Sequence, residues 1–310
     1  MSRINHRSLG KLIAGVVIFV AVFATGGSLV RAAQSSVNLG SAASFAILAG
    51  TPNITDAGNT SVINGNVGLS PATGAGIGLL CSEVTGTIYS VDAAGPLPCR
   101  VTDGPLMVTA KNNLTNAYID AAGRTPLTTV PTELGGTTLV AGVYSSISTT
   151  FGVTAGAGAL TLDGQGDPSS VFIFEAPFSG NGLTIGNGST VALINGAQAC
   201  NVFWRVDTAS IGTTATFVGT VLALNSITVA NAATISGRLL ARNGNVTLIN
   251  DTITTSTCAG NDSSSNTVVV PGLPNTGLFG SQSVLWIVVP SAVISAILLL
   301  AYVARRKHLI

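Results

Sequence analysis

A short internal repeat is the feature that most limits how this chain folds. Residues 219–225 (GTVLALN) align with 237–243 (GRLLARN) at an offset of 18, and 227–229 align with 246–248 at an offset of 19. Each repeat alternates short apolar stretches with Gly and Asn corners, as short β-strands and turns do. A near-constant period of this length is typical of β-solenoid coils. A β-sandwich also uses short strands but does not predict the constant offset.

The period also predicts the shape of each coil and leaves room for one helix outside the repeat. Three strands of about 4–5 residues with their corners fill one period, which favours a triangular cross-section. Apolar residues recur at helical spacing between Leu106 and Ala121. Pro105 suits a first helical turn and Gly123 suits a helix end. We therefore expect a mainly β protein with one long helix over 105–122, packed closely because its apolar stripe is made of small residues.

An apolar–Thr–apolar triplet recurs along the chain. Because side chains alternate across a strand, its threonine points outward and stacked coils place such residues in a ladder about 4.8 Å apart. A further pair of threonines, one repeat apart, stacks in the same way. The candidates for an outward face are Thr161, Thr184, Thr216, Thr228, Thr234 and Thr247. Threonine is also a common strand former, so the ladder is interpreted either as structural filling or as a binding face.

Charge and histidine content exclude several kinds of function. Residues 33–304 hold all 12 acidic residues and only 6 of the 13 basic ones, a net charge of −6, which argues against a nucleic-acid-binding surface. The two histidines, His6 and His308, lie in the terminal segments, which excludes His-dependent catalysis and His-ligated metal from the body. We expect no enzyme activity, no cofactor and no metal.

The N-terminal end has the pattern of an export signal. Residues 1–11 carry three basic side chains, an apolar run follows over 12–23, and small residues lead to Ala32. This predicts a signal peptide over 1–32, cleaved after Ala32 or Ala33. A permanent anchor is the alternative, but the apolar run is short for a membrane span of about 20 residues.

The C-terminal end carries three features in order. A pentapeptide comes first, made of Leu273, Pro274, Asn275, Thr276 and Gly277. An uncharged run over 284–304 follows, with a length of roughly 31 Å as a helix, and then a basic tail. This order resembles the LPxTG cell-wall sorting signal, with 259–272 as a flexible linker.

The resemblance implies that a sortase cuts between Thr276 and Gly277 and joins the chain to peptidoglycan. Before sorting, the span 284–304 lies in the membrane with its basic end in the cytoplasm. A plain membrane anchor is the alternative. Both interpretations predict an exported protein, anchored to the cell wall or membrane on the extracellular side.

The cysteines predict disulfide bonds, because an even number in an exported chain is typical of them. Four cysteines allow three pairings. The two pairs that are closer in sequence, Cys81–Cys99 and Cys200–Cys258, are favoured. A metal site is disfavoured because no CxxC spacing is present.

Several segments spread over 37–258 resemble the ice-binding-protein-like family of bacteria, fungi and algae. They include VNLGSA (37–42), FAILAG (45–50), GNVG (65–68), TLDGQGDP (161–168), NGAQACNVFW (195–204) and GRLLARNG (237–244). The resemblance implies a discontinuous right-handed β-solenoid over 33–258, with the long helix alongside and an inserted cap region. It also implies adsorption to ice through a flat Thr/Ala/Gly-rich face. The alternative is a cell-wall adhesin or envelope structural module that binds protein or glycan with the same fold.

Overall fold

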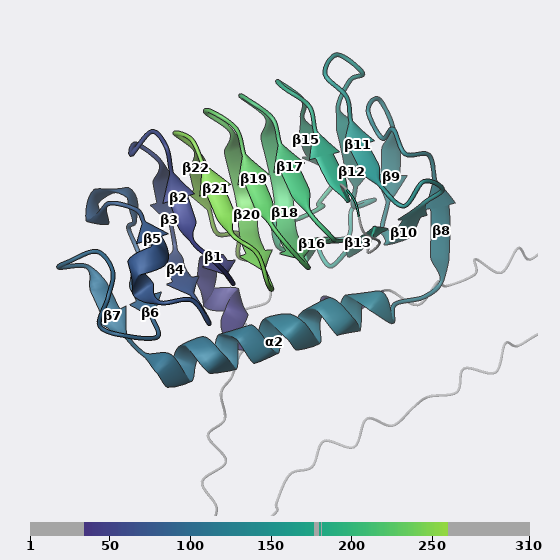
Figure 1. Ribbon diagram of the computed structural model, residues 1–310. Coiled ribbons are helices and arrows are strands. Elements are labelled where there is room, and N and C mark those ends of the chain that lie inside the picture. The colour runs from purple at the N-terminus through teal and green to yellow at the C-terminus, as the bar shows by residue number, and fades with distance from the viewer. Residues whose placement is uncertain (1–33, 177–179, 181, 260–310) are drawn as a thin grey trace, which may run out of the picture. The chain divides into compact units, whose positions relative to one another are not determined.

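The computed structural model describes residues 34–176, 180 and 182–259 (Figure 1). The predicted signal peptide, the predicted linker beyond residue 259 and the sorting signal with its span at 284–304 lie outside the described residues. Within the described ranges, no helix is both long and apolar enough to cross a membrane.

The described chain is mainly β, with its strands in three parallel sheets. The twelve-strand sheet runs in the order β7 (Arg100–Thr102), β6 (Ile88–Ser90), β4 (Asn66–Leu69), β1 (Phe45–Ala49), β20 (Thr234–Ala241), β18 (Thr216–Ala223), β16 (Val202–Val206), β13 (Phe172–Ala176), β10 (Gly142–Ser146) and β8 (Leu127–Val130). β22 (Thr252–Thr254) joins it through β20, and β3 (Val62–Asn64) pairs with β22.

The other two sheets are shorter. The seven-strand sheet contains β11 (Phe151–Val153), β14 (Leu183–Ile185), β17 (Ala209–Ile211), β19 (Ile227–Val229), β21 (Val246–Leu248), β2 (Ile54–Asp56) and β5 (Ile77–Gly78). The three-strand sheet contains β15 (Val191–Ile194), β12 (Leu160–Asp163) and β9 (Thr138–Val140). Short 3₁₀ turns η1 (Gly40–Ser44), η2 (Gly74–Gly76), η3 (Cys81–Glu83) and η4 (Ala199–Asn201) lie between strands.

The order of the coils in space differs from their order in sequence. From β1 the chain builds coils to one end of the stack at β7, and helix α2 (Gly104–Ala122) then carries it to the other end at β8 (Figure 1). It returns coil by coil until β20 pairs with β1, with Leu239 opposite Ile47. Segments from the two ends of the described chain therefore lie side by side in the middle of the stack.

The register between neighbouring coils confirms the repeat found in the sequence. β18 and β20 pair without interruption from Thr216 opposite Thr234 to Ala223 opposite Ala241, the same offset as in the sequence alignment. The corners repeat as well: Thr214, Ala232 and Asn250 have φ values of 56°, 61° and 56°. The same left-handed turn therefore recurs in successive coils.

Aromatic rings from successive coils stack inside the structure. Tyr144, Phe174 and Trp204 occupy the same register position on β10, β13 and β16. The rings of Phe174 and Trp204 lie nearly parallel, with centroids 3.9 Å apart. The Trp204 indole N–H donates to the carbonyl of Val218 at 3.1 Å, so its polar atom is satisfied in the core. This column fills the core between β10 and β16.

Helix α2 confirms the predicted helix and begins one residue earlier, at Gly104. The carboxylate of Asp103 accepts a hydrogen bond from the amide of Leu106 at 2.9 Å, which caps the first turn. Its buried stripe contains Met107, Ala110, Leu114, Ala117, Tyr118 and Ala121. These side chains pack on the outer side of the twelve-strand sheet, against residues such as Ile173, Leu222 and Leu240.

Both predicted disulfides are present. Cys81–Cys99 and Cys200–Cys258 each join Cα atoms 5.5 Å apart. The first lies in the segment that forms the β6–β7 end of the stack. The second fixes the chain after β22 to η4.

Candidate functional site

A row of small polar side chains crosses the seven-strand sheet. At the middle of each strand one residue points outward between two inward-facing residues, most of them buried. Strand register places these residues opposite one another from coil to coil. In spatial order they are Gly152, Thr184, Ser210, Thr228, Thr247, Thr55 and Gly78. We call the five hydroxyl-bearing members, Thr184, Ser210, Thr228, Thr247 and Thr55, the threonine ladder.

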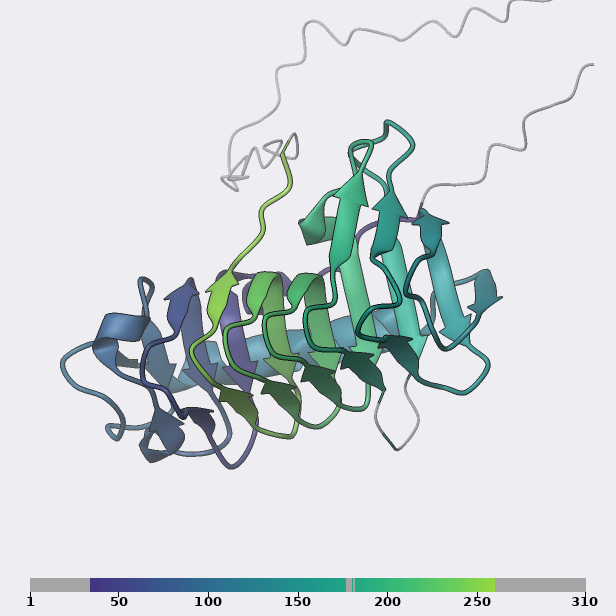
Figure 2. The same cartoon turned by 90° about the horizontal axis from the view of Figure 1, so that it is seen from above.

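The ladder lies on a row of short strands along one side of the stack (Figure 2). Neighbouring strands in a sheet are about 4.8 Å apart, so methyl and hydroxyl groups repeat at that spacing. The ladder carries no charged side chain. The result is an extended and regular surface that is neutral along the ladder, and the nearest acidic side chain in its line, Glu133, lies beyond Gly152.

The six candidate threonines fall on more than one face. Thr184, Thr228 and Thr247 belong to the ladder. Thr161 lies on the three-strand sheet, opposite Thr138 and Ala192.

Thr216 and Thr234 lie opposite each other on the first halves of β18 and β20, and Thr252 continues their row on β22. We call Thr216, Thr234 and Thr252 the second threonine row. All three are exposed. Triplet spacing identified outward positions but did not assign them to a common face.

Two ladder residues were missed in the sequence. Ser210 lies in an Ala-Ser-Ile triplet, which has the same alternation with a different hydroxyl residue. Thr55 lies in the N-terminal coil, far in sequence from the repeat, and reaches the ladder only because β2 pairs with β21. An alternation search that accepted serine would have found Ser210, whereas Thr55 is followed by Asp56 and does not fit the apolar–hydroxyl–apolar pattern.

Side-chain hydrogen bonds between coils stabilise the corners beside the ladder. The Ser226 hydroxyl donates to Asn245 Oδ1 at 2.6 Å, and Asn245 Nδ2 donates to the ladder hydroxyl of Thr247 at 3.0 Å. At the other corner, Asn250 Nδ2 donates to Asn231 Oδ1 at 2.7 Å. The bonds of Ser226 with Asn245 and of Asn250 with Asn231 hold successive coils in one register and so keep the ladder regular.

A shallow groove runs beside the ladder at its β11–β17 end. Its lining is uncharged: Gly152, Val153, Thr154, Ala155, Thr184, Ile185, Gly186, Asn187, Ser210, Ile211, Gly212 and Ala230. At Gly212 a Cβ would lie 2.7 Å from the backbone nitrogen of Asn187. Glycine is required here because adjacent coils approach each other closely.

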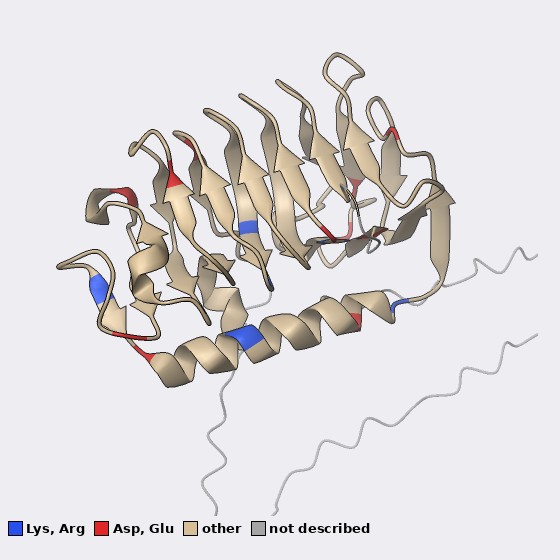
Figure 3. Cartoon of the chain, in the orientation of Figure 1, with Lys and Arg blue, Asp and Glu red and all other residues tan. Residues whose placement is uncertain are grey.

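Acidic groups near this face are held away from the ladder by local hydrogen bonds. Asp56 is buried at a corner. Burial raises its pKa, but hydrogen bonds with Glu83 and from the amides of Ser61 and Asn250 outweigh this and hold the pKa well below its usual range. Charged residues elsewhere on the described chain lie mostly at turns, on the helix and at the ends of the stack (Figure 3).

The partner of Asp56 has the opposite shift. Burial and the hydrogen bond with Asp56 raise the pKa of Glu83 to about 7. The two carboxyl groups therefore share one proton at mildly acidic pH. Within the described part of the chain, no three His, Cys, Asp or Glu side chains are grouped so as to hold a metal ion.

Comparison with known proteins places this architecture in a family. The model of the ice-binding-like family matches residues 47–254, which covers all three sheets and the helix. The chain belongs to the ice-binding-like family. Its relatives include an ice-binding protein from Colwellia sp., 41% identical over 244 residues, which cover 76% of this chain and 90% of that protein. An ice-binding protein from Flavobacterium frigoris (strain PS1) is 43% identical over 222 residues, covering 70% and 76%.

Solved structures of ice-binding proteins share the fold. An ice-binding protein from an Antarctic biological consortium aligns with a TM-score of 0.62 at 36% identity, over 75% of this chain and 97% of that one. The corresponding domain of Shewanella frigidimarina ice-binding protein 1 aligns with a TM-score of 0.64 at 31% identity, over 73% and 99%. Membership of this ice-binding-like family therefore rests on both sequence and fold.

Proposed function

We propose that this protein binds ice through the threonine ladder. The observation that carries the proposal is the unbroken register from Thr184 to Thr55, which forms a regular neutral row across five coils. Methyl groups disfavour disordered hydration, while hydroxyls hydrogen-bond to water held at fixed positions. Charged side chains bind their own hydration shells and would disrupt an ordered layer. Relatives that are named ice-binding proteins support this assignment.

The ladder is a better candidate than the second threonine row. The ladder extends over β14, β17, β19, β21 and β2, and glycines continue it at both ends. The second threonine row covers three coils, Thr190 extends it by one more through a bridge to Thr216, and Val62, 46% exposed, follows at its other end. A longer regular row presents more simultaneous contacts to a crystal face.

The fold that supports the ladder is, in this proposal, a discontinuous right-handed β-solenoid of triangular cross-section with an inserted cap region. The three parallel sheets would be its sides. The protein acts by adsorption and not by catalysis, which agrees with the names of its relatives.

The proposed location is the cell surface. The sequence features over 1–32 and 273–310 support export, sortase processing and attachment to peptidoglycan, with a membrane-inserted stage before sorting. A linker over 259–272 reaches roughly 50 Å when fully extended, which keeps the domain near the envelope. We infer a cell-attached ice-binding protein, with an adhesin for protein or glycan as the alternative outcome.

The test compares matched variants on the two faces. A fragment over 33–276 is assayed for thermal hysteresis and for inhibition of ice recrystallisation, with circular dichroism to verify folding. Thr228→Tyr in the ladder should remove most of the activity, whereas Thr234→Tyr in the second threonine row should retain it. A folded fragment without either activity contradicts ice binding and favours the adhesin. If only Thr234→Tyr loses the activity, the ice-binding face is the second threonine row and not the ladder.

A further inference from the structure

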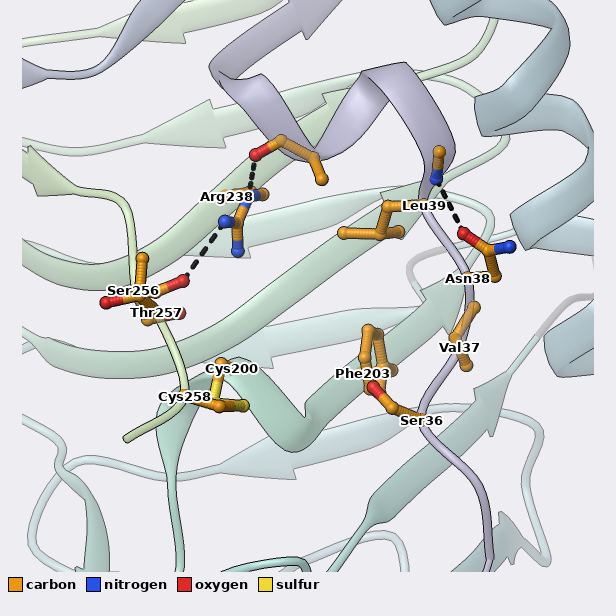
Figure 4. Close-up of a pocket in the computed structure, with 12 residues that line it drawn as sticks. Ser36, Val37, Asn38, Leu39, Cys200, Phe203, Arg238, Ser256, Thr257 and Cys258 are labelled. Carbon is orange, nitrogen blue, oxygen red and sulfur yellow. Dashed lines mark hydrogen bonds between the residues drawn. A yellow bond between two sulfur atoms is a disulfide. The ribbon is translucent and has the colours of Figure 1, made fainter. Parts of the chain in front are cut away.

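A pocket lies outside the solenoid core, against the outer side of the twelve-strand sheet (Figure 4). Its volume is about 390 Å³. The N-terminal segment 36–43 and the segment 256–258 border it, and Phe203 and Arg238 belong to the strands beneath. No ladder residue lines this pocket, so it is independent of the proposed ice-binding face.

Arg238 is a buried cation in this pocket without an acidic partner. The residue is 7% exposed. Nε donates to the carbonyl of Ala43 at 2.9 Å and Nη2 to the carbonyl of Ser256 at 3.0 Å, and both acceptors are neutral. In the described part of the chain, ion pairs join Arg124 with Asp120 and Arg205 with Glu175, and none reaches Arg238. A buried guanidinium without a counterion is unfavourable.

The third nitrogen of the Arg238 guanidinium has no hydrogen-bond partner among the described residues. A guanidinium has five N–H donors, and only two bonds are made here. In Figure 4 this group lies at one side of the pocket, with Phe203 and Val37 across from it. Unused donors therefore remain beside an open space.

Two buried hydroxyls next to Arg238 also have no partner. Thr220 lies directly opposite Arg238 on the neighbouring strand, with Phe203 on its other side, and all three share the outward side of the sheet. Its Oγ1 is buried without a hydrogen bond, as is the Oγ of Ser256, which lines the pocket. Buried polar atoms are nearly always paired, so two unpaired hydroxyls beside an incompletely bonded guanidinium indicate a missing partner.

We propose that this pocket binds a small organic oxoanion, with a carboxylate as the best match. Carboxylate oxygens accept several hydrogen bonds and pair strongly with a guanidinium, which supplies the missing counterion of Arg238. The walls formed by Val37, Leu39 and Phe203 are apolar and suit the organic part of the ligand. The volume is sufficient for a molecule as large as an amino acid or an aromatic acid.

The experiment uses the full chain in detergent, with benzoate, acetate and sulfate as probes and sodium chloride at equal ionic strength as reference. Melting temperature is measured against probe concentration, and ¹⁵N signals of the arginine side chains are followed in parallel. We expect a saturable rise in melting temperature, largest for benzoate, and a shift of the Arg238 signal. No saturable rise beyond that of chloride would overturn the proposal.

Matched variants localise the effect. Arg238→Gln should weaken benzoate binding at least tenfold, while Arg100→Gln, which removes an equal charge at the β7 end of the stack and does not line the pocket, should leave it unchanged. Because Arg238→Gln also removes two structural hydrogen bonds, Thr220→Val provides a second test: it should fold and bind benzoate several-fold more weakly. Binding that is unchanged in both Arg238→Gln and Thr220→Val excludes this pocket. Thr228→Tyr, which alters the ladder and not the pocket, should still bind benzoate, so the pocket can be tested independently of ice binding.

Discussion

Thr247 lies directly opposite Thr55, although the two residues come from the C-terminal and N-terminal coils. Their pairing depends on the closure of the stack where β20 meets β1, since the same coils bring β21 against β2. The proposed ice-binding surface is therefore continuous only when the two ends of the domain are joined. Any change that loosens this closure divides the ladder between Thr247 and Thr55.

The contribution of the N-terminal coil to the ladder is tested by Thr55→Tyr. The bulky ring would project from the row and prevent close contact with a flat crystal face. Thermal hysteresis should fall to less than half, as for Thr228→Tyr, with an unchanged β spectrum. Val62→Tyr, on the same N-terminal coil but in line with the second threonine row, is the control and should keep its activity. Full activity in Thr55→Tyr would show that the ladder ends at Thr247.

Lys111 connects helix α2 to the closure. Its Nζ donates to the carbonyls of Ala241 and Arg242 at 2.8 and 2.5 Å, at the end of β20. Replacement by Ala leaves both carbonyls without this donor and removes buried methylene groups. We expect a loss of about 2–4 kcal/mol in the free energy of unfolding, measured with urea. A loss below about 0.5 kcal/mol would mean that the helix is held by its apolar stripe alone.

The same lysine predicts a pH dependence. Burial, with a smaller contribution from Arg242, lowers the pKa of Lys111 to about 7. The unfolded chain keeps this proton up to about pH 10.4, so between about pH 7 and 10 it binds more protons than the folded chain. Stability therefore rises with pH in this window. Lys111→Met should flatten that rise in urea titrations at pH 6.5, 8 and 9.5, and an identical slope in wild type and variant would argue against the shift.

Glu175 predicts a dependence of opposite sign at lower pH. Burial raises its pKa to about 7, partly opposed by Arg205, whose Nη1 lies 3.5 Å from Oε2. The folded chain then binds more protons than the unfolded chain between about pH 4.5 and 7, so stability falls as pH rises through this window. Glu175→Gln should remove the fall and be more stable than wild type at pH 8, by about 1–3 kcal/mol.

The hydrogen bonding of Glu175 also supports a gain in stability for Glu175→Gln at pH 8. Its Oε1 is buried without a hydrogen bond, so the ionised form lacks full compensation. Asp120→Asn is the control, because Asp120 is half-exposed in its ion pair with Arg124 and should change the pH profile little. If Glu175→Gln is instead less stable at pH 8, the ion pair with Arg205 outweighs the cost of burial.

The disulfide between Cys200 and Cys258 closes a loop of 58 residues and fixes the segment that borders the Arg238 pocket. In the chain-entropy model, its loss costs about 4 kcal/mol. The double variant Cys200→Ser, Cys258→Ser should therefore melt well below wild type, as measured by calorimetry. It should also bind benzoate more weakly. If its melting temperature instead equals that of wild type, the segment is held in place without the disulfide.

Much of the architecture could be predicted because it depends on local patterns. The register of β18 with β20 follows the offset of the sequence repeat, since both coils are neighbours in sequence and in space. The stripe from Met107 to Ala121 is buried as predicted, because helical periodicity alone selects those positions. The pairing Cys81–Cys99 agreed with the choice of the nearer partner, because both cysteines lie within one local part of the stack.

The site was predicted only in part. The sequence by itself determined the coil period, the outward direction of each threonine and the shortage of charge, because alternation along a strand is a local property. Tertiary structure alone decided that Thr184, Thr228 and Thr247 share a face from which Thr161, Thr216 and Thr234 are excluded. It also brought Thr55 into the ladder and left Arg238 buried without a carboxylate. The physical reason is that corner geometry and the pairing of β20 with β1 set which outward residues become neighbours, and both depend on contacts between segments far apart in the chain.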